Sequence, residues 1–244
     1  MKSVTLVGID GLGKAVNFYI KIFELCNREF KFEKNILFTS AQSRTIDISD
    51  GISIDFIQIP KLNYREFNEF CLTELNPFVE TSHILTVQTD GFVSNGKMWK
   101  DEYYEYDYIG QPWLNPDGKT FTNFPWVNSY ENSVGEGGFT LRSKKLLESI
   151  LKIDRNTIKN SVHSGVNEDV FISSYAREFL KSEGCKFATP EIGSEFCAGM
   201  RDFNFDKLES SFGFHAQPYV EEVLNRYGKK YSENYNDFIV DYKK

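Results

Sequence analysis

The chain has 244 residues, enough for one large domain or two small ones, and a formal net charge of −7. A chain of this length buries roughly 70–75% of the surface that its unfolded form would expose. Its 22 Phe and 13 Tyr indicate a globular protein rather than a disordered one. The negative charge argues against non-specific binding to nucleic acid or to anionic lipid, because both need a basic surface.

Cysteine placement and hydropathy bear on the compartment. Cys26, Cys71, Cys185 and Cys197 are scattered, without the spacing of a zinc site, which is typical of reduced thiols in a cytosolic protein. No apolar run approaches the ~20 residues of a membrane span. We therefore expect a cytoplasmic protein, which could still contact a membrane peripherally through a partner or a lipid-linked substrate.

Strand and helix signals alternate through the first part of the chain. Apolar, β-branched runs predict strands, and apolar side chains spaced by three and four residues predict helices. The predicted order is strand 3–9, helix 13–30, strand 35–41, strand 53–60, helix 63–78 and strand 83–89. This alternation implies a mostly parallel, Rossmann-like α/β sheet covered by helices on both faces. Ligand sites of such sheets lie at the carboxyl ends of the strands, where Asp10 and Asp90 fall.

The sequence changes character after Asp90. Residues 99–139 are rich in Trp, Tyr, Pro, Gly and Asn, which predicts an irregular, aromatic-lined binding region. Helical periodicity returns at 143–153 and 168–184, and a polar helix with a frayed end is predicted from Tyr219. Because the sequence contains no internal repeat and no linker, we expect a single domain.

The first glycine motif is Gly11-Leu12-Gly13, which follows a strand and opens a helix as a dinucleotide-binding loop does. The third glycine position holds Val16, however, and the next strand ends without the acid that would bind a ribose. A dinucleotide site, a tight turn beside some other nucleotide and an ordinary turn all remain open.

The segment Gln88-Thr89-Asp90-Gly91 also allows two interpretations. An Asp-Gly step after a strand is often only a turn. A carboxylate in this position equally suits Mg²⁺ or Mn²⁺, which favour oxygen ligands and share them with substrate phosphates.

The second glycine cluster comprises Gly135, Gly137 and Gly138, just before a predicted helix. Glycines allow unusual backbone angles and the close approach of a ligand, so the cluster predicts a pocket wall, with a flexible turn as the alternative.

Asn167 suits a helix cap, and the acids that follow it, Glu168 and Asp169, favour the dipole of the predicted helix. An aspartate there can also face a cleft and act as a general base.

In this order, the segments resemble the GT-A-fold glycosyltransferases. That superfamily combines a D-x-D motif after a strand, a glycine-rich loop, an x-E-D motif on a helix and a C-terminal histidine. The corresponding segments are 88–90, 135–138, 167–169 and His215. More narrowly, VQTDGF, YDYIGQPW, VGEGGFTLRS, NEDVF and FGFHA resemble a largely uncharacterised family of glycosyltransferase-like domains. The resemblance spans roughly residues 80 to 216.

The resemblance implies transfer of a sugar from a nucleoside diphosphate sugar, with UDP as the best match, to a glycan or lipid-linked acceptor in polysaccharide biosynthesis. Asp90 and His215 would bind Mn²⁺ or Mg²⁺, which stabilises the leaving diphosphate as a Lewis acid. Gln88 replaces the first acid of the D-x-D motif, which leaves room for a metal-independent enzyme.

Further roles follow from the same resemblance. Asp169 would be the general base of an inverting reaction, and Glu168 would orient a substrate hydroxyl. Arg142 would pair with a phosphate through its planar guanidinium group, and Asp10 would contact the base or ribose. The residues expected around the donor are Asp10, Gln88, Asp90, Gly137, Gly138 and Arg142.

The resemblance also divides the single domain. The expected parts are a nucleotide-sugar-binding half (1–92), an acceptor-binding and catalytic half (93–218) and a C-terminal tail (219–244). Trp99, Trp113 and Trp126 either stack on acceptor sugars or pack inside the protein. An inactive module that binds a sugar nucleotide or a glycan is the alternative function, followed by an NAD(P)-binding oxidoreductase.

Overall fold

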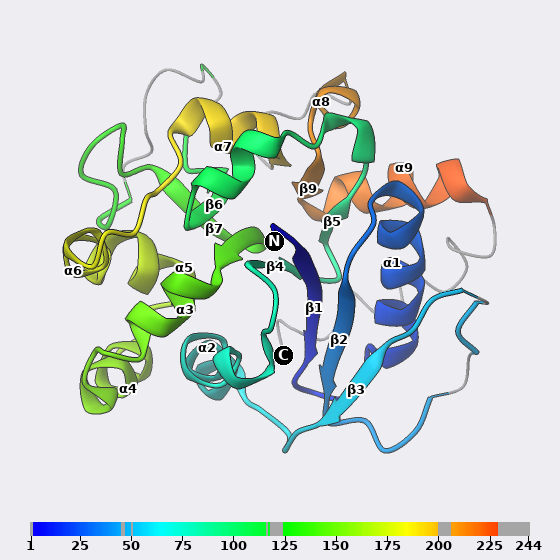
Figure 1. The fold of residues 1–244 in the computed structure, drawn as a ribbon, viewed down its shortest axis with the longest axis horizontal. Coiled ribbons are helices and arrows are strands. Elements are labelled where there is room, and N and C mark those ends of the chain that lie inside the picture. The colour runs from blue at the N-terminus through cyan, green and yellow to red at the C-terminus, as the bar shows by residue number, and fades with distance from the viewer. Residues whose placement is uncertain are drawn as a thin grey trace.

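A six-stranded sheet with helices on both faces forms the centre of the molecule (Figure 1). The computed structural model describes residues 2–44, 47–49, 51–115, 117, 124–199 and 206–228. The strand order is β3-β2-β1-β4-β7-β6. These strands are β1 (Val4–Asp10), β2 (Lys34–Thr39), β3 (Asp55–Gln58), β4 (His83–Val87), β6 (Tyr108–Pro112) and β7 (Val134–Ser143).

The sheet is mostly parallel, as the sequence predicts. Strand β1 runs parallel to both β2 and β4, and β2 runs parallel to β3. Only β7 is reversed, pairing antiparallel with β4 and with β6. The chain builds outward from β1 to β3 and then returns to add β4 on the other side of β1. A crevice at the carboxyl ends of β1 and β4 is therefore expected at this change of direction.

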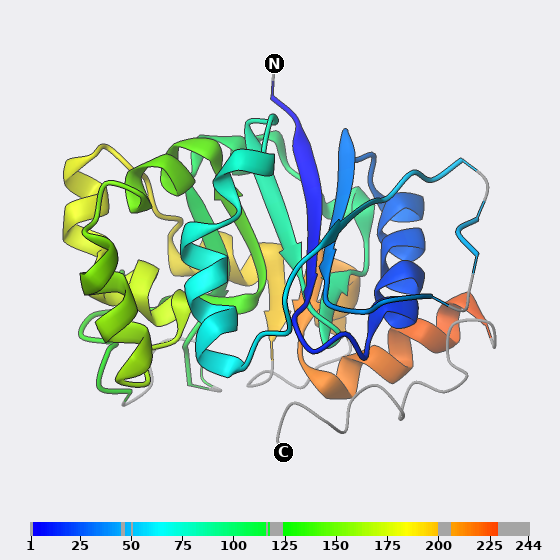
Figure 2. The same cartoon turned by 90° about the horizontal axis from the view of Figure 1, so that it is seen from below.

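Helices cover the sheet in two layers. Figure 2 shows α1 (blue) and α9 (orange) on one side of the sheet, and α2 (cyan) with the green helices α3 and α4 on the other. The helices are α1 (Val16–Glu29), α2 (Tyr64–Thr73), α3 (Lys144–Ile150), α4 (Arg155–His163), α5 (Glu168–Val170), α6 (Arg177–Ser182), α7 (Pro190–Phe196), α8 (Asp206–Ser210) and α9 (Gln217–Tyr227). None of them, within the described part of the chain, is long and apolar enough to cross a membrane.

A second, three-stranded sheet lies beside the first. Its order is β5-β9-β8, formed by β5 (Gly91–Val93), β8 (Cys197–Gly199) and β9 (Gly213–His215). Phe92, Phe214 and Phe196 join the cluster of buried residues that links α1 and α9 to one face of the main sheet. The small sheet thereby brings residues from three distant parts of the chain to the edge of the candidate site.

Several elements differ from the sequence predictions. The second glycine cluster lies inside strand β7 and not in a loop, and the predicted irregular region 99–139 contains β6 and the start of β7. The predicted helix 168–184 is divided into α5, a π-helical turn at Phe171–Tyr175 and α6.

The C-terminal helix also differs from its prediction. Tyr219, Val220, Val223 and Leu224 of α9 are fully buried, so this helix is amphipathic and belongs to the core rather than to a polar tail. The frayed end predicted beyond it lies outside the described residues. All four cysteines are buried and none forms a disulfide.

Candidate active site

Asp90 lies in a tight turn between β4 and β5. The backbone N–H of Gln88 donates to the Gly91 carbonyl over 2.9 Å, and that of Gly91 donates to the Gln88 carbonyl over 3.2 Å. The Asp90 carbonyl accepts a hydrogen bond from the N–H of Ala216 over 2.9 Å, and Gly91 pairs with His215 across β5 and β9. The turn thus holds Asp90 beside His215, and the role of Asp90 as a metal ligand stays a prediction.

His215 stands between two carboxylates. Its Nε2 lies 3.6 Å from Asp90 Oδ1, and its Nδ1 lies 3.8 Å from Glu136 Oε1. The Nδ1 atom is buried and has no hydrogen-bond partner among the described residues. Burial would lower the pKa of His215, but the charge of Asp90 and then that of Glu136 raise this pKa to about 9. Burial would likewise raise the pKa of Asp90, but His215 holds it below its usual range. The pair is therefore charged at neutral pH.

A bulge in β7 places the glycine cluster at the centre of the site. Ile109 of β6 pairs with Leu141 and Gln111 pairs with Glu136, so two steps along β6 correspond to five along β7. Bulges bend a strand, redirect its side chains and are common beside active sites. The glycine cluster is a wall of the site, as predicted, but it is a bulged strand and not a loop.

Gly137 and Gly138 face opposite sides of this strand. A Cβ at Gly137 would lie 2.5 Å from Glu168 Oε1, and one at Gly138 would lie 2.0 Å from His215 Nε2. Real side chains cannot approach so closely, so only glycine allows the acids of α5 and the ring of His215 to pack against the two sides of one strand.

Asp169 is half-buried against Gly137. Its Oδ2 accepts a hydrogen bond from the Gly137 N–H over 2.9 Å, and its Oδ1 accepts one from the N–H of Val170 over 2.6 Å. Burial and the charges of Glu168 and Glu136 nevertheless raise the pKa of Asp169 to about 8. A carboxylate with a pKa near the working pH is suited to general base catalysis. The π-helical turn that follows α5 agrees with this placement, because such turns are frequent at functional sites.

Arg142 and Glu168 form a buried ion pair beside Asp169. Arg142 Nη2 donates to Glu168 Oε1 over 3.1 Å, and the two side chains are only 1% and 7% exposed. Arg142 Nε donates to the Thr140 hydroxyl over 2.9 Å, whereas Nη1 has no partner among the described residues. The charge of Arg142 is thus directed to Glu168 inside the protein, and its contact with a phosphate stays a prediction.

Four of the predicted site residues line one cavity. Gln88, Gly137, Arg142 and Glu168 surround a space of about 270 Å³, counted out to its open mouth. Val7 and Val87 also line it, which places it at the β1–β4 crevice that the strand order predicts. Gln88 therefore lines this cavity while its backbone forms the turn, and its role toward the donor stays a prediction.

Asp10 lies apart from this cluster. It is the last residue of β1 and has no exposed surface. Its carboxylate accepts hydrogen bonds from the N–H groups of Lys14 and Ala15 and from the Thr39 hydroxyl, over 3.1 to 3.2 Å. Burial raises the pKa of Asp10 despite these bonds. Its observed role is to hold the turn between β1 and α1, and its contact with a base or ribose stays a prediction.

The three tryptophans pack against other aromatic rings, Trp113 being buried and Trp99 and Trp126 half-buried. The Trp99 ring lies 4.6 Å from that of Phe30 and 5.1 Å from that of Phe212, measured between centroids. Trp113 is 5% exposed, and Trp126 lies 6.1 Å from it. Packing is thus observed for these residues, and stacking on acceptor sugars stays a prediction.

Glu136 is the site residue that the sequence interpretation missed. It lies between Gly135 and Gly137, and as part of a loop its side chain would have had no defined direction. Within a strand, alternation sends it to the same side as Gly138, toward His215. The feature of the sequence that could have pointed to Glu136 is its position as a single acid among three glycines.

The donor set bears on metal binding. Among the described residues, no group of three or more His, Cys, Asp or Glu side chains is arranged to hold a metal ion. Asp90 and His215 offer two donors, with the second ring nitrogen of His215 directed at Glu136. Because Mg²⁺ and Mn²⁺ commonly use one or two protein ligands together with substrate phosphates, this pair fits a cation that arrives with a diphosphate.

A known protein family matches more than half of the chain. Residues 54–215 match DUF5672, which is described as a protein of unknown function. The chain belongs to the DUF5672 family. The DUF5672 match begins just before β3 and ends at His215, so it includes Asp90, Glu136 and Asp169. Among proteins with a curated description, none matches this chain.

Solved structures resemble this DUF5672 chain in fold. The galactosyltransferase LgtC, in complex with donor and acceptor sugar analogues, is 12% identical, with a TM-score of 0.52 over 87% of this chain and 86% of that one. A glycosyltransferase involved in glycosylation of the major capsid of PBCV-1 is 8% identical, with a TM-score of 0.47 over 87% of this chain and 94% of that one. The likeness to LgtC shows that the chain has the GT-A fold, as the sequence motifs predict.

Proposed function

We propose that the protein is a glycosyltransferase that moves a sugar from a nucleoside diphosphate sugar, with a UDP-sugar as the first choice, to a hydroxyl of a glycan or lipid-linked acceptor. One observation carries the proposal. The β7 bulge at Gly137 and Gly138 holds a carboxylate of raised pKa, Asp169, on one side and the Asp90–His215 pair on the other. Asp169 also contributes to the raised pKa of His215, so the two groups are near enough to interact. The GT-A fold supports the same reaction class.

The side of the bulge that holds Asp90, Glu136 and His215, here called the open side, suits the leaving diphosphate. Mn²⁺ or Mg²⁺ bound at Asp90 and His215 would supply Lewis-acid stabilisation of the charge that develops there. In the metal-independent case, the imidazolium form of His215, which its raised pKa favours, offers a positive charge to the same phosphates in place of the cation. Because Gln88 stands in place of an acid, these residues suit a weakly held cation or a metal-independent reaction.

Asp169 suits the acceptor. As the acceptor oxygen bonds to the anomeric carbon, its proton passes to the Asp169 carboxylate. The bond between the anomeric carbon and the diphosphate oxygen breaks, and its electron pair leaves with the diphosphate. A single displacement of this kind inverts the anomeric configuration. Glu168 is occupied by its contact with Arg142, so the Asp169 carboxylate is the one left to take the proton.

A donor panel tests this function. Purified protein with Mn²⁺, and in parallel with EDTA, is given UDP-glucose, UDP-galactose, UDP-N-acetylglucosamine and GDP-mannose, and release of the nucleoside diphosphate is followed. We expect turnover of at least one donor, which Asp169→Asn lowers about 10²–10⁴-fold and which Asp90→Ala also lowers strongly. Asp55→Asn serves as the matched control, since Asp55 lies on β3 at the far edge of the sheet. Full activity of the Asp169 and Asp90 variants would refute the assigned roles.

A binding module without turnover is the second candidate. The absence of a three-residue metal set among the described residues, together with Gln88, favours it. In that case calorimetry would detect binding of UDP or a UDP-sugar, while no donor is consumed with any acceptor tested.

A further inference from the structure

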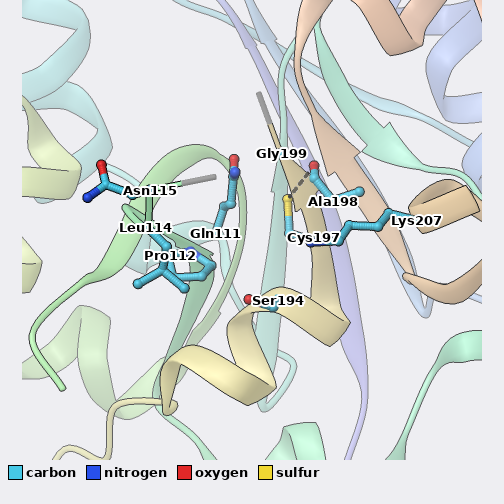
Figure 3. A pocket seen from close by; sticks show the side chains of 9 residues that line it. All are labelled: Gln111, Pro112, Leu114, Asn115, Ser194, Cys197, Ala198, Gly199 and Lys207. Carbon is cyan, nitrogen blue, oxygen red and sulfur yellow. Dashed lines mark hydrogen bonds between the residues drawn. The ribbon is translucent and has the colours of Figure 1, made fainter. Parts of the chain in front are cut away.

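A second hollow adjoins the candidate site, between the end of β6, α7, β8 and α8 (Figure 3). It holds about 330 Å³, counted out to its open mouth. Gln111, Asn115, Ser194 and Lys207 supply its polar side chains, and Gly199 supplies backbone. Figure 3 shows the Gln111 side chain standing between Asn115 and strand β8.

Strand pairing connects this hollow to the open side of the bulge. Gln111 of β6 pairs with Glu136 of β7, and Gly199 of β8 pairs with His215 of β9. Two residues that line the hollow are thus the strand partners of the two residues that flank the proposed diphosphate site. Asp169, by contrast, packs against the opposite face of the bulge.

Three features of the structure distinguish Gln111 among the residues that line the hollow. The pairing of β6 with β7 shifts register on both sides of Gln111, as at a bulge that redirects a side chain. A Cβ at Gly199 would lie 1.1 Å from Gln111 Nε2, so any larger residue there would displace the amide from its present position. Gln111 is only 6% exposed. Its Oε1 is buried, and it has no hydrogen-bond partner among the described residues. An unsatisfied buried acceptor is unfavourable and marks a group that a ligand can satisfy.

We propose that Gln111 is a specificity-determining residue, which accepts a hydrogen bond through Oε1 from a hydroxyl of the transferred sugar bound in this hollow. The ligand is a neutral, hydroxyl-bearing pyranose ring, whose C–H face is suited to the apolar lining of Pro112, Leu114 and Ala198. The donor sugar is favoured over the acceptor because the hollow lies on the diphosphate side of β7, whereas the base lies on the other side. This inference rests on the proposed function.

The test separates binding of the sugar from binding of the nucleotide. Calorimetry measures the Kd of UDP, GDP, UDP-glucose, UDP-galactose, UDP-N-acetylglucosamine and GDP-mannose for the wild type and for Gln111→Met. Methionine has a similar volume and no acceptor oxygen, so it should keep the packing. Gln58→Met, at an exposed glutamine of β3, is the matched control. We expect Gln111→Met to leave the Kd of UDP or GDP within twofold and to weaken the preferred sugar nucleotide about five- to tenfold, the loss of one hydrogen bond.

The outcomes distinguish this inference from the proposed function. If the wild type binds a sugar nucleotide and Gln111→Met binds it equally well, the role of Gln111 is refuted and the proposed function stands. If Gln111→Met raises the KM of an acceptor and leaves donor binding unchanged, the hollow belongs to the acceptor and the inference is again refuted. If the wild type binds no sugar nucleotide of the panel, the proposed function fails, and the inference fails with it. Should Gln111→Met not fold, Gln111→Ala is measured in its place and is expected to give the same pattern.

Discussion

The two sides of the β7 bulge differ in how their charges are arranged. On one side, Arg142 and Glu168 are 1% and 7% exposed and neutralise each other. On the other side, His215, Glu136 and Asp90 are 15%, 21% and 39% exposed and lie 3.6 to 3.8 Å apart. A buried ion pair offers little to a ligand, whereas partly exposed charges around an unsatisfied ring nitrogen can still exchange partners. The difference indicates that the closed side supports one reactive group, Asp169, while the open side receives the charged part of the substrate.

The largest effect is expected at the reactive group of the closed side. Asp169→Asn should lower kcat about 10²–10⁴-fold, the usual contribution of a general base, and leave the Kd of the donor unchanged. Steady-state kinetics together with calorimetry measure the two quantities. A variant that keeps more than a third of the wild-type kcat would remove Asp169 from the chemistry.

The buried ion pair should dominate stability. Arg142→Met leaves the Glu168 carboxylate buried without its partner, which should reduce the free energy of unfolding by about 3–5 kcal/mol. Urea denaturation followed by circular dichroism measures this loss. The double variant Arg142→Met with Glu168→Gln carries neither charge and should recover part of the stability. An Arg142→Met protein as stable as the wild type would contradict the closed-side description.

Adding one methyl group to either glycine should separate the two sides. In Gly138→Ala the new Cβ would lie 2.0 Å from His215 Nε2, so it should displace the ring and weaken Mn²⁺ binding in the presence of UDP about tenfold. In Gly137→Ala it would meet Glu168 Oε1 at 2.5 Å, so kcat should fall while Mn²⁺ affinity is retained. Electron paramagnetic resonance of free Mn²⁺ reports the affinity. Equal losses of Mn²⁺ affinity in both variants would show that the sides are not independent.

The pH dependence of the rate should follow Asp169. Its pKa is raised to about 8, chiefly by burial and then by Glu168 and Glu136, while the N–H groups of Val170 and Gly137 oppose the shift. The carboxylate is the active form, so kcat should rise with pH, by about tenfold between pH 7 and pH 9. A pH–rate profile measures the slope, and the residual activity of Asp169→Asn should lack it. A rate that falls over this range would contradict the assignment of Asp169 as the base.

Much of the fold could be predicted from the sequence because its first half is built of local patterns. The strands and helices from β1 to β4 contain runs of four to fourteen residues, long enough to show a period of two or 3.6. The turn at Asp90 and the acids in the first turn of α5 could also be predicted, because turns and helix starts depend on neighbouring residues, although Asn167 makes no capping hydrogen bond with its side chain. The short strands β5, β8 and β9 could not, because three residues show no period and their partners are distant in the sequence.

The sequence by itself determined the α/β class, the order of the motifs and the positions of Asp90, Asp169 and His215. The tertiary structure decided which of the charged residues are available. It enclosed Asp10 and Arg142 in internal hydrogen bonds and turned Glu136 toward His215. The reason is physical, since exposure and pairing depend on side-chain directions set by strand bulges and by contacts between distant segments. The identity and spacing of residues along the sequence specify neither the exposure nor the pairing of these side chains.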